Sequence, residues 1–409
     1  MRLLLGFLSF TLFLFSCQTN QHKMINGQLK SGTWRAMLQL DEKNVLPFTF
    51  EVNDSGEILI VNADERIRVK DIVYGDSGEV IINFPVFSTY VKATLKDNML
   101  SGFWINPEKK DYKIPFTAQF GRNERFAVAE SAAIFNAEGR WEVTFSQGTD
   151  GEYKAIGIFK QIGHKITGTF LTETGDYRYL EGQVEEGNLK LSCFDGAHAF
   201  LFTGYGKGSR IENGLFYSGN HWKEPWVAIR NDSFTLADPD TLTYLKEGYE
   251  RLDFSFSDEN GDSISLSDPQ FKNKVVIVQI MGSWCPNCMD ESAFLVDLHK
   301  KYHSKGLEII AVDYEIRNDF EVFKRNVARM KKDLGITYPI VFGGPSKKSE
   351  SAKTLPMLNH ILSYPTTIFI DKKGKIKKIQ TGFNGPGTGS LYNDYKKNTT
   401  VLIESLLKK

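Results

Sequence analysis

The chain has 409 residues, which is enough for two or three domains of roughly 100 to 200 residues each. Its 50 basic and 50 acidic residues cancel, so no net field would attract a nucleic acid, and we expect no nucleic-acid partner. With only four cysteines, a packed core rather than a disulfide framework must stabilise a protein of this size.

The chain begins with the pattern of a secretion signal. A positively charged start precedes an apolar stretch, residues 3–15, that is too short to span a membrane as a helix. Residues 14–17, Leu-Phe-Ser-Cys, resemble a bacterial lipobox. The resemblance implies that the signal peptide 1–16 is removed and that Cys17 is lipidated, with residues 17–29 as a tether. The alternative is an ordinary signal peptide with an incidental cysteine.

Residues 30–232 have the pattern of β-structure that occurs twice. Short segments rich in aromatic and β-branched residues alternate with Gly, Asn and Asp turns. Four motifs recur with a shift of about 110 residues, which indicates a duplication: Gly32–Trp34 as Gly139–Trp141, Gly78–Val80 as Gly187–Leu189, Gly102–Trp104 as Gly214–Phe216, and Pro115–Ala118 as Pro225–Ala228. We expect two β-repeats, 30–123 and 137–232, each with about seven or eight antiparallel strands.

Such strands must protect their edges, so each repeat is predicted to form a barrel or a sandwich. The repeats could hold a ligand or a partner, but the simpler interpretation is that they space the following domain from the membrane. Cys193 falls opposite Phe84 when the repeats are aligned. We therefore expect it to fill a core position as a small hydrophobic residue, not to act in redox chemistry.

After a linker, residues 233–250, the pattern changes to alternating strands and helices, which predicts an α/β domain over 251–409. An apolar run that starts at Val275 fits a buried strand, and the residues after Cys288 fit a helix. The further expected elements are a short hairpin within 252–266, a strand at 307–314, a helix at 319–334, a strand at 338–342, a hairpin within 366–380 and a final helix that includes 402–407.

Two cysteines, Cys285 and Cys288, stand between that strand and that helix. The amino-terminal end of a helix carries partial positive charge, so it favours the thiolate of Cys285 as the attacking nucleophile. Cys288, one turn further in, is placed to resolve the mixed disulfide. The sequence therefore predicts a redox-active disulfide between these two residues.

The alternative for this cysteine pair is a zinc site, because His299 and His303 follow on the same chain. If the helix is continuous, Cys288 and His299 lie ~16 Å apart along its axis, at about 1.5 Å per residue, which is too far to share one ion. We therefore expect the histidines to lie on a solvated helix face, and we expect no metal and no cofactor.

Several motifs follow one another along the chain: Gly282–Cys288, Glu291, Tyr302, Gly306–Asp313 and Tyr364–Gly374. In this order they resemble the TlpA/ResA-like thiol-disulfide reductases, over about residues 250 to 409. The resemblance implies a thioredoxin-like fold, protein disulfides as substrates and a cis peptide before Pro365. It also implies that Trp284, Tyr364 and Pro365 contact the substrate, whereas the alternative for Pro365 is an ordinary trans proline.

Glu291 matches the acidic residue that this family carries near its active site. In thioredoxins a buried aspartate six residues before the first cysteine manages protons, but here that position is Gln279, which cannot ionise. Glu291 is therefore the candidate to accept the proton of the resolving thiol. The alternative is an acidic residue favoured at a helix start by the dipole. Ala293 departs from the proline that family members often have at that position.

Together these features predict a lipid-anchored thiol-disulfide oxidoreductase of the bacterial cell envelope, facing the periplasm or another extracytoplasmic space. It would reduce protein disulfides and receive electrons from a membrane thiol donor. One alternative is a thiol peroxidase, but peroxiredoxins need a threonine where this chain has Gly282. Another is a ligand- or partner-binding lipoprotein with an accessory redox domain.

Overall fold

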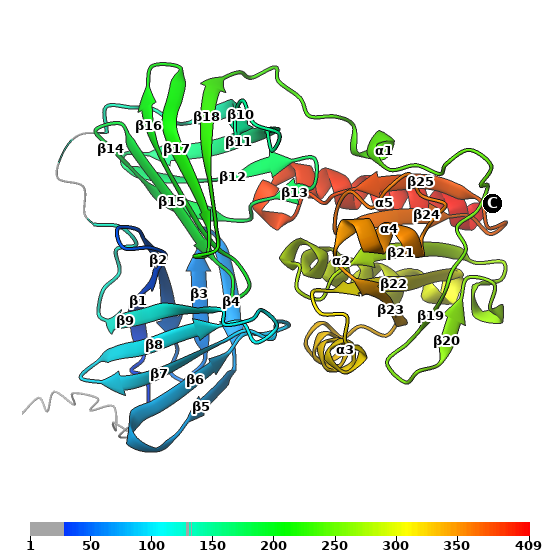
Figure 1. Cartoon of the computed structure of the whole chain (residues 1–409), viewed down its shortest axis with the longest axis horizontal. Helices are drawn as coiled ribbons and strands as arrows, with labels where there is room; N and C mark the ends of the chain where they lie inside the picture. The colour runs from blue at the N-terminus through cyan, green and yellow to red at the C-terminus, as the bar shows by residue number, and fades with distance from the viewer. Residues whose placement is uncertain (1–27, 128–130, 132) are drawn as a thin grey trace, which may run out of the picture.

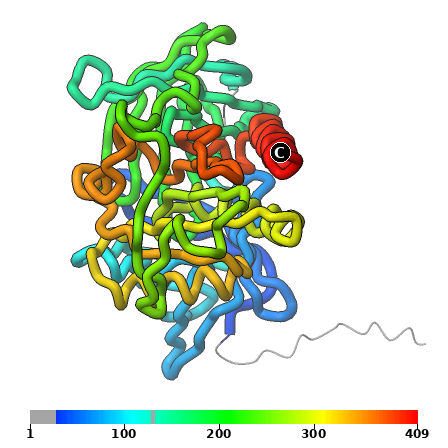
Figure 2. The backbone as a smooth tube through the Cα atoms, turned by 90° about the vertical axis from the view of Figure 1, so that its right-hand side faces the viewer, coloured from blue at the N-terminus to red at the C-terminus, as the bar shows by residue number. Residues whose placement is uncertain are grey.

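The computed structural model describes residues 28–127, 131 and 133–409. The predicted signal peptide and Cys17 lie outside the described residues. The described chain folds into two β-units and an α/β part that we call the redox module, residues 251–409. Figure 1 shows the β-units stacked on the left and the redox module on the right, and in Figure 2 the redox module lies in front of both. Within the described residues, none of the helices has the length and apolar character needed to cross a membrane.

β-unit 1 is an antiparallel sheet of nine strands in the order β4-β3-β2-β1-β9-β8-β7-β6-β5. The first strand, β1, pairs with both β2 and the last strand, β9, and the sheet has a barrel-like form with β4 and β5 at its ends. Its strands are β1 (Gly32–Gln39), β2 (Val45–Val52), β3 (Ile58–Asn62), β4 (Glu65–Val69), β5 (Asp71–Tyr74), β6 (Glu79–Asn83), β7 (Tyr90–Lys96), β8 (Met99–Ile105) and β9 (Lys113–Phe120).

β-unit 2 repeats this arrangement, with β10 paired to both β11 and β18. Here β11 also pairs with β12, so the barrel closes. The strands are β10 (Gly139–Phe145), β11 (Tyr153–Ile162), β12 (Lys165–Thr172), β13 (Gly175–Asp176), β14 (Leu180–Glu185), β15 (Asn188–Phe194), β16 (Ala199–Lys207), β17 (Arg210–Ser218) and β18 (Trp222–Arg230).

The predicted duplication is confirmed in the side chains as well as in the topology. Trp34 and Trp141 are fully buried at the same place in the two units. Each indole Nε1 donates to the carbonyl oxygen four residues earlier, at 3.0 Å from Lys30 and 2.8 Å from Ala137. Each unit has nine strands rather than the seven or eight expected. The short strand β13 and the charged end strand β4 lack the apolar pattern that predicts strands.

The two β-units pack together through a shared core. Phe194 of β-unit 2 is buried among the core residues of β-unit 1, and its ring stacks on that of Phe48 with centroids 4.3 Å apart. The buried Arg125 donates to the side chains of Ser192 at 3.0 Å and Asn62 at 3.2 Å. Because aromatic packing and buried hydrogen bonds both cross the junction, the two units form one body.

The redox module is built on a five-stranded mixed sheet in the order β23-β22-β21-β24-β25. Helices α2, α3 and α5 pack on one face of the sheet, and the segments around residues 252–271 and 355–361 cover the other. The α/β prediction is thus confirmed. The elements are β19 (Ser255–Ser257), β20 (Ser263–Ser265), β21 (Val275–Met281), α2 (Pro286–Tyr302), β22 (Leu307–Glu315), α3 (Phe320–Leu334), β23 (Ile340–Pro345), α4 (Lys348–Thr354), β24 (Thr366–Ile370), β25 (Ile376–Thr381) and α5 (Ser390–Lys408).

The segment predicted as a linker is attached to the redox module. It contains the single helical turn α1 (Pro239–Leu242), which lies beside β25. The hydroxyl of Thr381 donates to that of Thr243 at 2.7 Å, and the backbone N–H of Lys246 donates to the carbonyl of Met357 at 2.8 Å. The connection from β18 therefore ends in fixed contacts on the redox module rather than in a free chain.

Candidate active site

The two cysteines lie where the strand–turn–helix pattern places them. The buried strand β21 ends at Met281, and Cys285 is the residue that caps the amino-terminal end of α2. Its Sγ accepts a hydrogen bond from the backbone N–H of Cys288 at 3.2 Å. The two residues form a disulfide with their Cα atoms 5.2 Å apart. A sulfur atom held at a helix start by an N–H donor is suited to carry the negative charge of a thiolate.

The loop that precedes β24 lies directly against this turn. The Tyr364–Pro365 peptide is cis, and the carbonyl oxygen of Tyr364 lies 3.4 Å from Cys285 Sγ. The rings of Trp284 and Tyr364 pack edge to face with centroids 5.7 Å apart. The indole of Trp284 is fixed by donation to the carbonyl of Tyr314 at 2.9 Å. The structure thus brings together the predicted substrate-contacting residues and the first cysteine.

Glu291 lies one turn further along α2 and is only 1% exposed. Its carboxyl accepts three hydrogen bonds: from Thr367 and Tyr395 hydroxyls, each at 2.7 Å, and from Gln279 Nε2 at 2.9 Å. The same Gln279 amide donates to the carbonyl of Cys288 at 3.3 Å. Burial raises the pKa of Glu291, although the three donors oppose the shift. The carboxyl and the second cysteine are therefore linked through the residue that replaces the thioredoxin aspartate.

Two further acidic residues, which the sequence analysis missed, hold Ser283, two residues before the first cysteine. The backbone N–H of Ser283 donates to Asp313 at 2.8 Å, and its hydroxyl donates to Glu315 at 2.9 Å. Asn326 on α3 also donates to Glu315, at 3.1 Å. Both carboxyls are fully buried, and burial raises the pKa of each. The signal available in the sequence was two acidic residues at the carboxyl end of a largely apolar strand.

On the opposite side, α2 is bound to the β-units through Arg178. This guanidinium is 7% exposed and pairs with Glu65 of β-unit 1 at 2.6 Å, with Asp195 of β-unit 2 at 3.0 Å, and with Asp290 of α2. The three carboxylates raise the pKa of Arg178 well above its usual range, although burial opposes this. One side chain therefore connects all three parts of the molecule immediately beside the cysteines.

The carboxyls around Arg178 differ in how readily they keep their charge. Burial opposes the charge of Asp195, but His198 and Arg178 lower its pKa to about 2. Burial raises the pKa of Asp290 to about 6, because Arg178 only partly offsets the desolvation, and Glu65 and Asp176 repel the charge. Glu65, Asp176, Asp195 and Asp290 outnumber the positively charged groups around them, which leaves an excess of negative charge. Asp290 therefore binds a proton more readily than Asp195.

The loop of β-unit 2 that contains β13 lies over the redox turn. The carbonyl of Asp176 accepts from Asn287 Nδ2 at 3.1 Å, and the carbonyl of Thr174 accepts from the hydroxyl of Ser363 at 2.6 Å. Cys285 is left only 6% exposed. The β-repeats therefore form part of the surroundings of the active-site turn, and their role as a spacer from a membrane stays a prediction.

A cavity of about 150 Å³ lies where the three parts of the molecule meet. Residues of all three parts line it, among them Lys109, His198, His221, Trp284 and Arg329. Because Trp284 immediately precedes the first cysteine, the cavity reaches the edge of the redox turn.

The prediction for Cys193 is confirmed, whereas the prediction for His299 and His303 is only partly correct. Cys193 is fully buried in the core of β-unit 2, as expected, and burial raises the pKa of its thiol well above the usual range. The histidines of α2 do not both lie on a solvated face. His303 is exposed, but His299 is 7% exposed, because its ring packs edge to face on that of Tyr338.

Known proteins resemble the redox part of this chain. A secreted thiol-disulfide isomerase from Corynebacterium glutamicum has 22% identity and a TM-score of 0.32, covering 43% of this chain and 99% of its own. A thiol-disulfide oxidoreductase from Bacteroides fragilis has 22% identity and a TM-score of 0.28, covering 36% of this chain and 99% of its own.

The sequence comparisons identify the family. The model of the Redoxin family matches residues 246–395. The thiol-disulfide oxidoreductase ResA of Bacillus subtilis is 30% identical over 151 residues, which are 37% of this chain and 74% of that protein. ResA of Geobacillus thermodenitrificans is 33% identical over 140 residues, 34% of this chain and 72% of its own. With its cysteine pair at a helix start, the chain therefore belongs to the ResA-like thiol-disulfide oxidoreductases of the Redoxin family.

Proposed function

We propose that this oxidoreductase is an exported, lipid-anchored protein that reduces protein disulfides in the bacterial cell envelope. The observation that carries the proposal is the Cys285–Cys288 pair at the start of α2, with Pro365 on one side and Glu291 beneath it. The lipobox-like residues before Cys17 support export and anchoring. The ResA relatives support the redox activity.

In the proposed reaction, the thiolate of Cys285 attacks one sulfur of a substrate disulfide. A mixed disulfide forms and one substrate thiolate leaves, which takes up a proton. Cys288 then attacks the sulfur of Cys285, so the second substrate thiolate leaves and the Cys285–Cys288 disulfide forms. The substrate gains two electrons, and the enzyme must be reduced again by a thiol donor, which we propose to be a membrane protein.

Glu291 is proposed to accept the proton of Cys288 before the second attack. A buried carboxyl with a raised pKa is a better proton acceptor near neutral pH than an ordinary glutamate. The Gln279 amide, which bonds both to Glu291 and to the carbonyl of Cys288, fixes the carboxyl relative to the helix start. The burial of Glu291 and its link to Cys288 through Gln279 support this role.

Trp284, Tyr364 and Pro365 are proposed to contact the substrate chain. The two aromatic rings pack against each other beside Cys285, and the hydroxyl of Tyr364 is held by the carbonyl of Ser346 at 3.1 Å. We propose that a substrate chain pairs with the backbone of this loop by strand addition. Cys285 is only 6% exposed, and the β13 loop is bonded to the neighbouring Asn287, so we propose that contacts between the β-units and the redox turn open before a substrate disulfide meets the sulfur.

The cysteine roles are tested by single substitutions. Cys285→Ser should abolish reduction of insulin disulfides, because the variant lacks the attacking thiolate. Cys288→Ser should accumulate mixed disulfides on Cys285, because the resolving thiol is missing. Non-reducing gels and mass spectrometry of trapped complexes provide the measurement. A Cys285→Ser variant that reduces insulin at the wild-type rate would show that the nucleophile is assigned wrongly.

The anchor is tested separately in a bacterial host that is fed labelled fatty acid. The wild-type protein should take up the label and sediment with membranes, because Cys17 becomes the lipidated amino terminus. Cys17→Ala should lose the label and be released or remain unprocessed, whereas the buried Cys193→Ala serves as the control for loss of a thiol elsewhere. Unlabelled wild-type protein in the soluble fraction would contradict the lipoprotein assignment but leave the redox chemistry untouched.

A further inference from the structure

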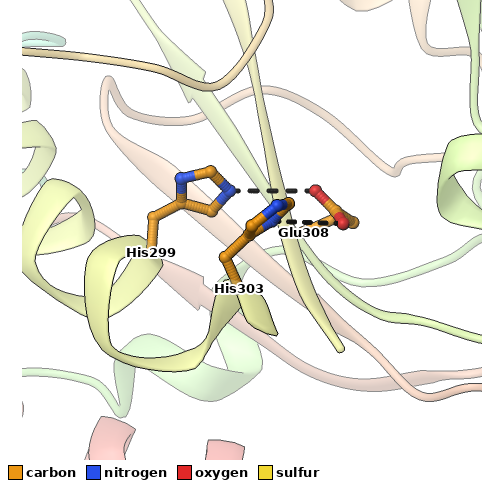
Figure 3. A group of neighbouring side chains, drawn as sticks. All are labelled: His299, His303 and Glu308. Carbon is orange, nitrogen blue, oxygen red and sulfur yellow. Dashed lines mark ion pairs between the residues drawn. The ribbon is translucent and has the colours of Figure 1, made fainter. Parts of the chain in front are cut away.

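Three potential metal ligands gather at the far end of α2 from the cysteines. Figure 3 shows His299 and His303 directed toward the carboxyl of Glu308. His303 Nδ1 lies 3.3 Å from Glu308 Oε1, and His299 Nε2 lies 3.7 Å from Glu308 Oε2. One ligand atom from each residue can be chosen so that all three lie within 4.8 Å of one another.

The backbone fixes this arrangement. His299 lies in α2, and His303, four residues on, is the residue that caps its carboxyl end with helical dihedral angles, so the two side chains project from the same side. A short turn over residues 303–305 ends α2, and Gly306, with φ of 101°, adopts the left-handed conformation that reverses the chain. Glu308, at the start of β22, is thereby brought back beside the last turn of the helix.

His299 is already oriented as a ligand. Its Nδ1 lies 3.1 Å from the hydroxyl oxygen of Thr337, which can accept the Nδ1–H and leave Nε2 with its lone pair free. That Nε2 is buried and has no hydrogen-bond partner among the described residues. A buried nitrogen that faces a carboxylate without a hydrogen bond is therefore an independent sign of a missing ligand.

We propose that His299, His303 and Glu308 bind a divalent transition-metal ion, with zinc the expected ion. Two imidazoles and one carboxylate are a ligand set that zinc accepts, with bonds of about 2.0 to 2.2 Å. Ligand atoms of a tetrahedral zinc ion are then separated by about 3.3 Å, so the observed separations need only small side-chain movements.

The surroundings indicate how the ion would enter and what it would do. The His303 side chain is 58% exposed, so the site opens to solvent and leaves the fourth position for water. Lys274 Nζ lies 3.9 Å from Glu308 Oε1 and would give up this contact when the metal binds. The ion would tie the end of α2 to β22, and so would stabilise the helix that carries the cysteines. The site is independent of the proposed redox function.

The test uses the full chain without a histidine tag, with the Cys285–Cys288 disulfide kept oxidised so that its thiols cannot bind metal. After treatment with EDTA, zinc chloride is titrated by calorimetry, and cobalt(II) absorption reports the coordination. We expect one zinc ion per chain, visible cobalt bands without thiolate charge transfer, and a thermal midpoint that rises with zinc.

The variants assign the site. His303→Ala is expected to fold, because the residue is exposed, and to weaken zinc binding by at least ~10-fold, the smallest loss typical even of residues that only support a ligand. Glu308→Gln should do the same. The matched control, His164→Ala in β-unit 2, should bind zinc as the wild type does. Absence of stoichiometric binding, or equal affinity in the wild type and His303→Ala, would overturn the proposal.

Discussion

The two sides of α2, one turn beyond the cysteines, hold neighbouring carboxyls by different means. Toward the core of the redox module, Glu291 is surrounded by the neutral donors of Gln279, Thr367 and Tyr395. Toward the β-units, Asp290 pairs with the cation of Arg178. Neutral donors allow a carboxyl to gain or lose its proton without breaking an ion pair, whereas an ion pair depends on the charge. The first side is therefore suited to proton transfer and the second to holding the modules together.

The largest expected effect comes from removing the ion pairs between Arg178 and the carboxylates on the side of α2 that faces the β-units. Arg178→Met removes the guanidinium that pairs with Glu65, Asp195 and Asp290, and leaves these carboxylates, of which Asp195 is buried, without that partner. Removal of one partner of a buried ion pair typically costs about 3 to 5 kcal/mol. Urea unfolding followed by tryptophan fluorescence measures the loss.

The control for this prediction is Arg210→Met, since Arg210 forms an ion pair with Glu212 at 3.0 Å but is 60% exposed. Such surface changes usually stay within about 0.5 kcal/mol. Alkylation of reduced Cys285 should also become faster in Arg178→Met, because the contact that holds the β13 loop is weakened. Equal losses of stability in the two variants would mean that Arg178 is no more important than a surface arginine.

The next largest effect is expected on the side of α2 that faces the core of the redox module, where Glu291 lies. Glu291→Gln keeps a polar side chain in place but cannot accept a proton, so release of substrate from the mixed disulfide should slow by ~10²-fold or more. Single-turnover kinetics near neutral pH measure this second step. The thiolate of Cys285 should be slightly favoured in the variant, because a negative charge nearby has been removed, and a thiolate titration checks this.

The matched control for Glu291→Gln is Glu321→Gln. Glu321 is likewise a helical acid near a helix start, in the first turn of α3, but its side chain is 68% exposed. Glu321→Gln should leave the rates of both steps, formation of the mixed disulfide and release of the substrate from it, unchanged. If the two variants had the same second-step rate as the wild type, Glu291 would be an ordinary helix-start acid without a role in proton transfer.

These two sides also differ in how far the sequence could predict them. Glu291, Gln279 and the cysteines lie within 13 residues on one strand–turn–helix unit, so local patterns and the family resemblance brought them together. Arg178 lies 112 positions before Asp290 and acts only because the closed barrel of β-unit 2 carries it there. Nothing in the local pattern around Arg178 indicates such a contact, since it depends on how two independently patterned modules dock.

The contrast between local patterns and distant contacts also explains which other features could be predicted from the sequence. The duplication was visible because tryptophan and glycine motifs repeat, and the two buried tryptophans, Trp34 and Trp141, make the same hydrogen bond. The burial of His299 was not visible, because it depends on Tyr338 and Thr337 from the loop after α3. Periodicity along one helix could not show what packs on its end.

The smallest expected effect is the change of folding stability with pH as the two carboxyls titrate. The pKa of Asp290 is raised to about 6 in the folded protein, compared with about 3.9 in an unfolded chain. The folded state therefore binds this proton more tightly, and its stabilising effect is complete below pH ~4 and is lost as the pH rises through about 6. One proton changes the free energy of unfolding by at most about 1.4 kcal/mol per pH unit.

Asp290→Asn should therefore flatten the fall in stability between pH 4 and 7, measured by urea unfolding at each pH. Glu291→Gln should remove a contribution of the same sign, because burial also raises the pKa of Glu291. If the wild type instead gained stability over Asp290→Asn as the pH rose, the attraction of Arg178 would exceed the cost of burial, and Asp290 would be a permanently charged partner.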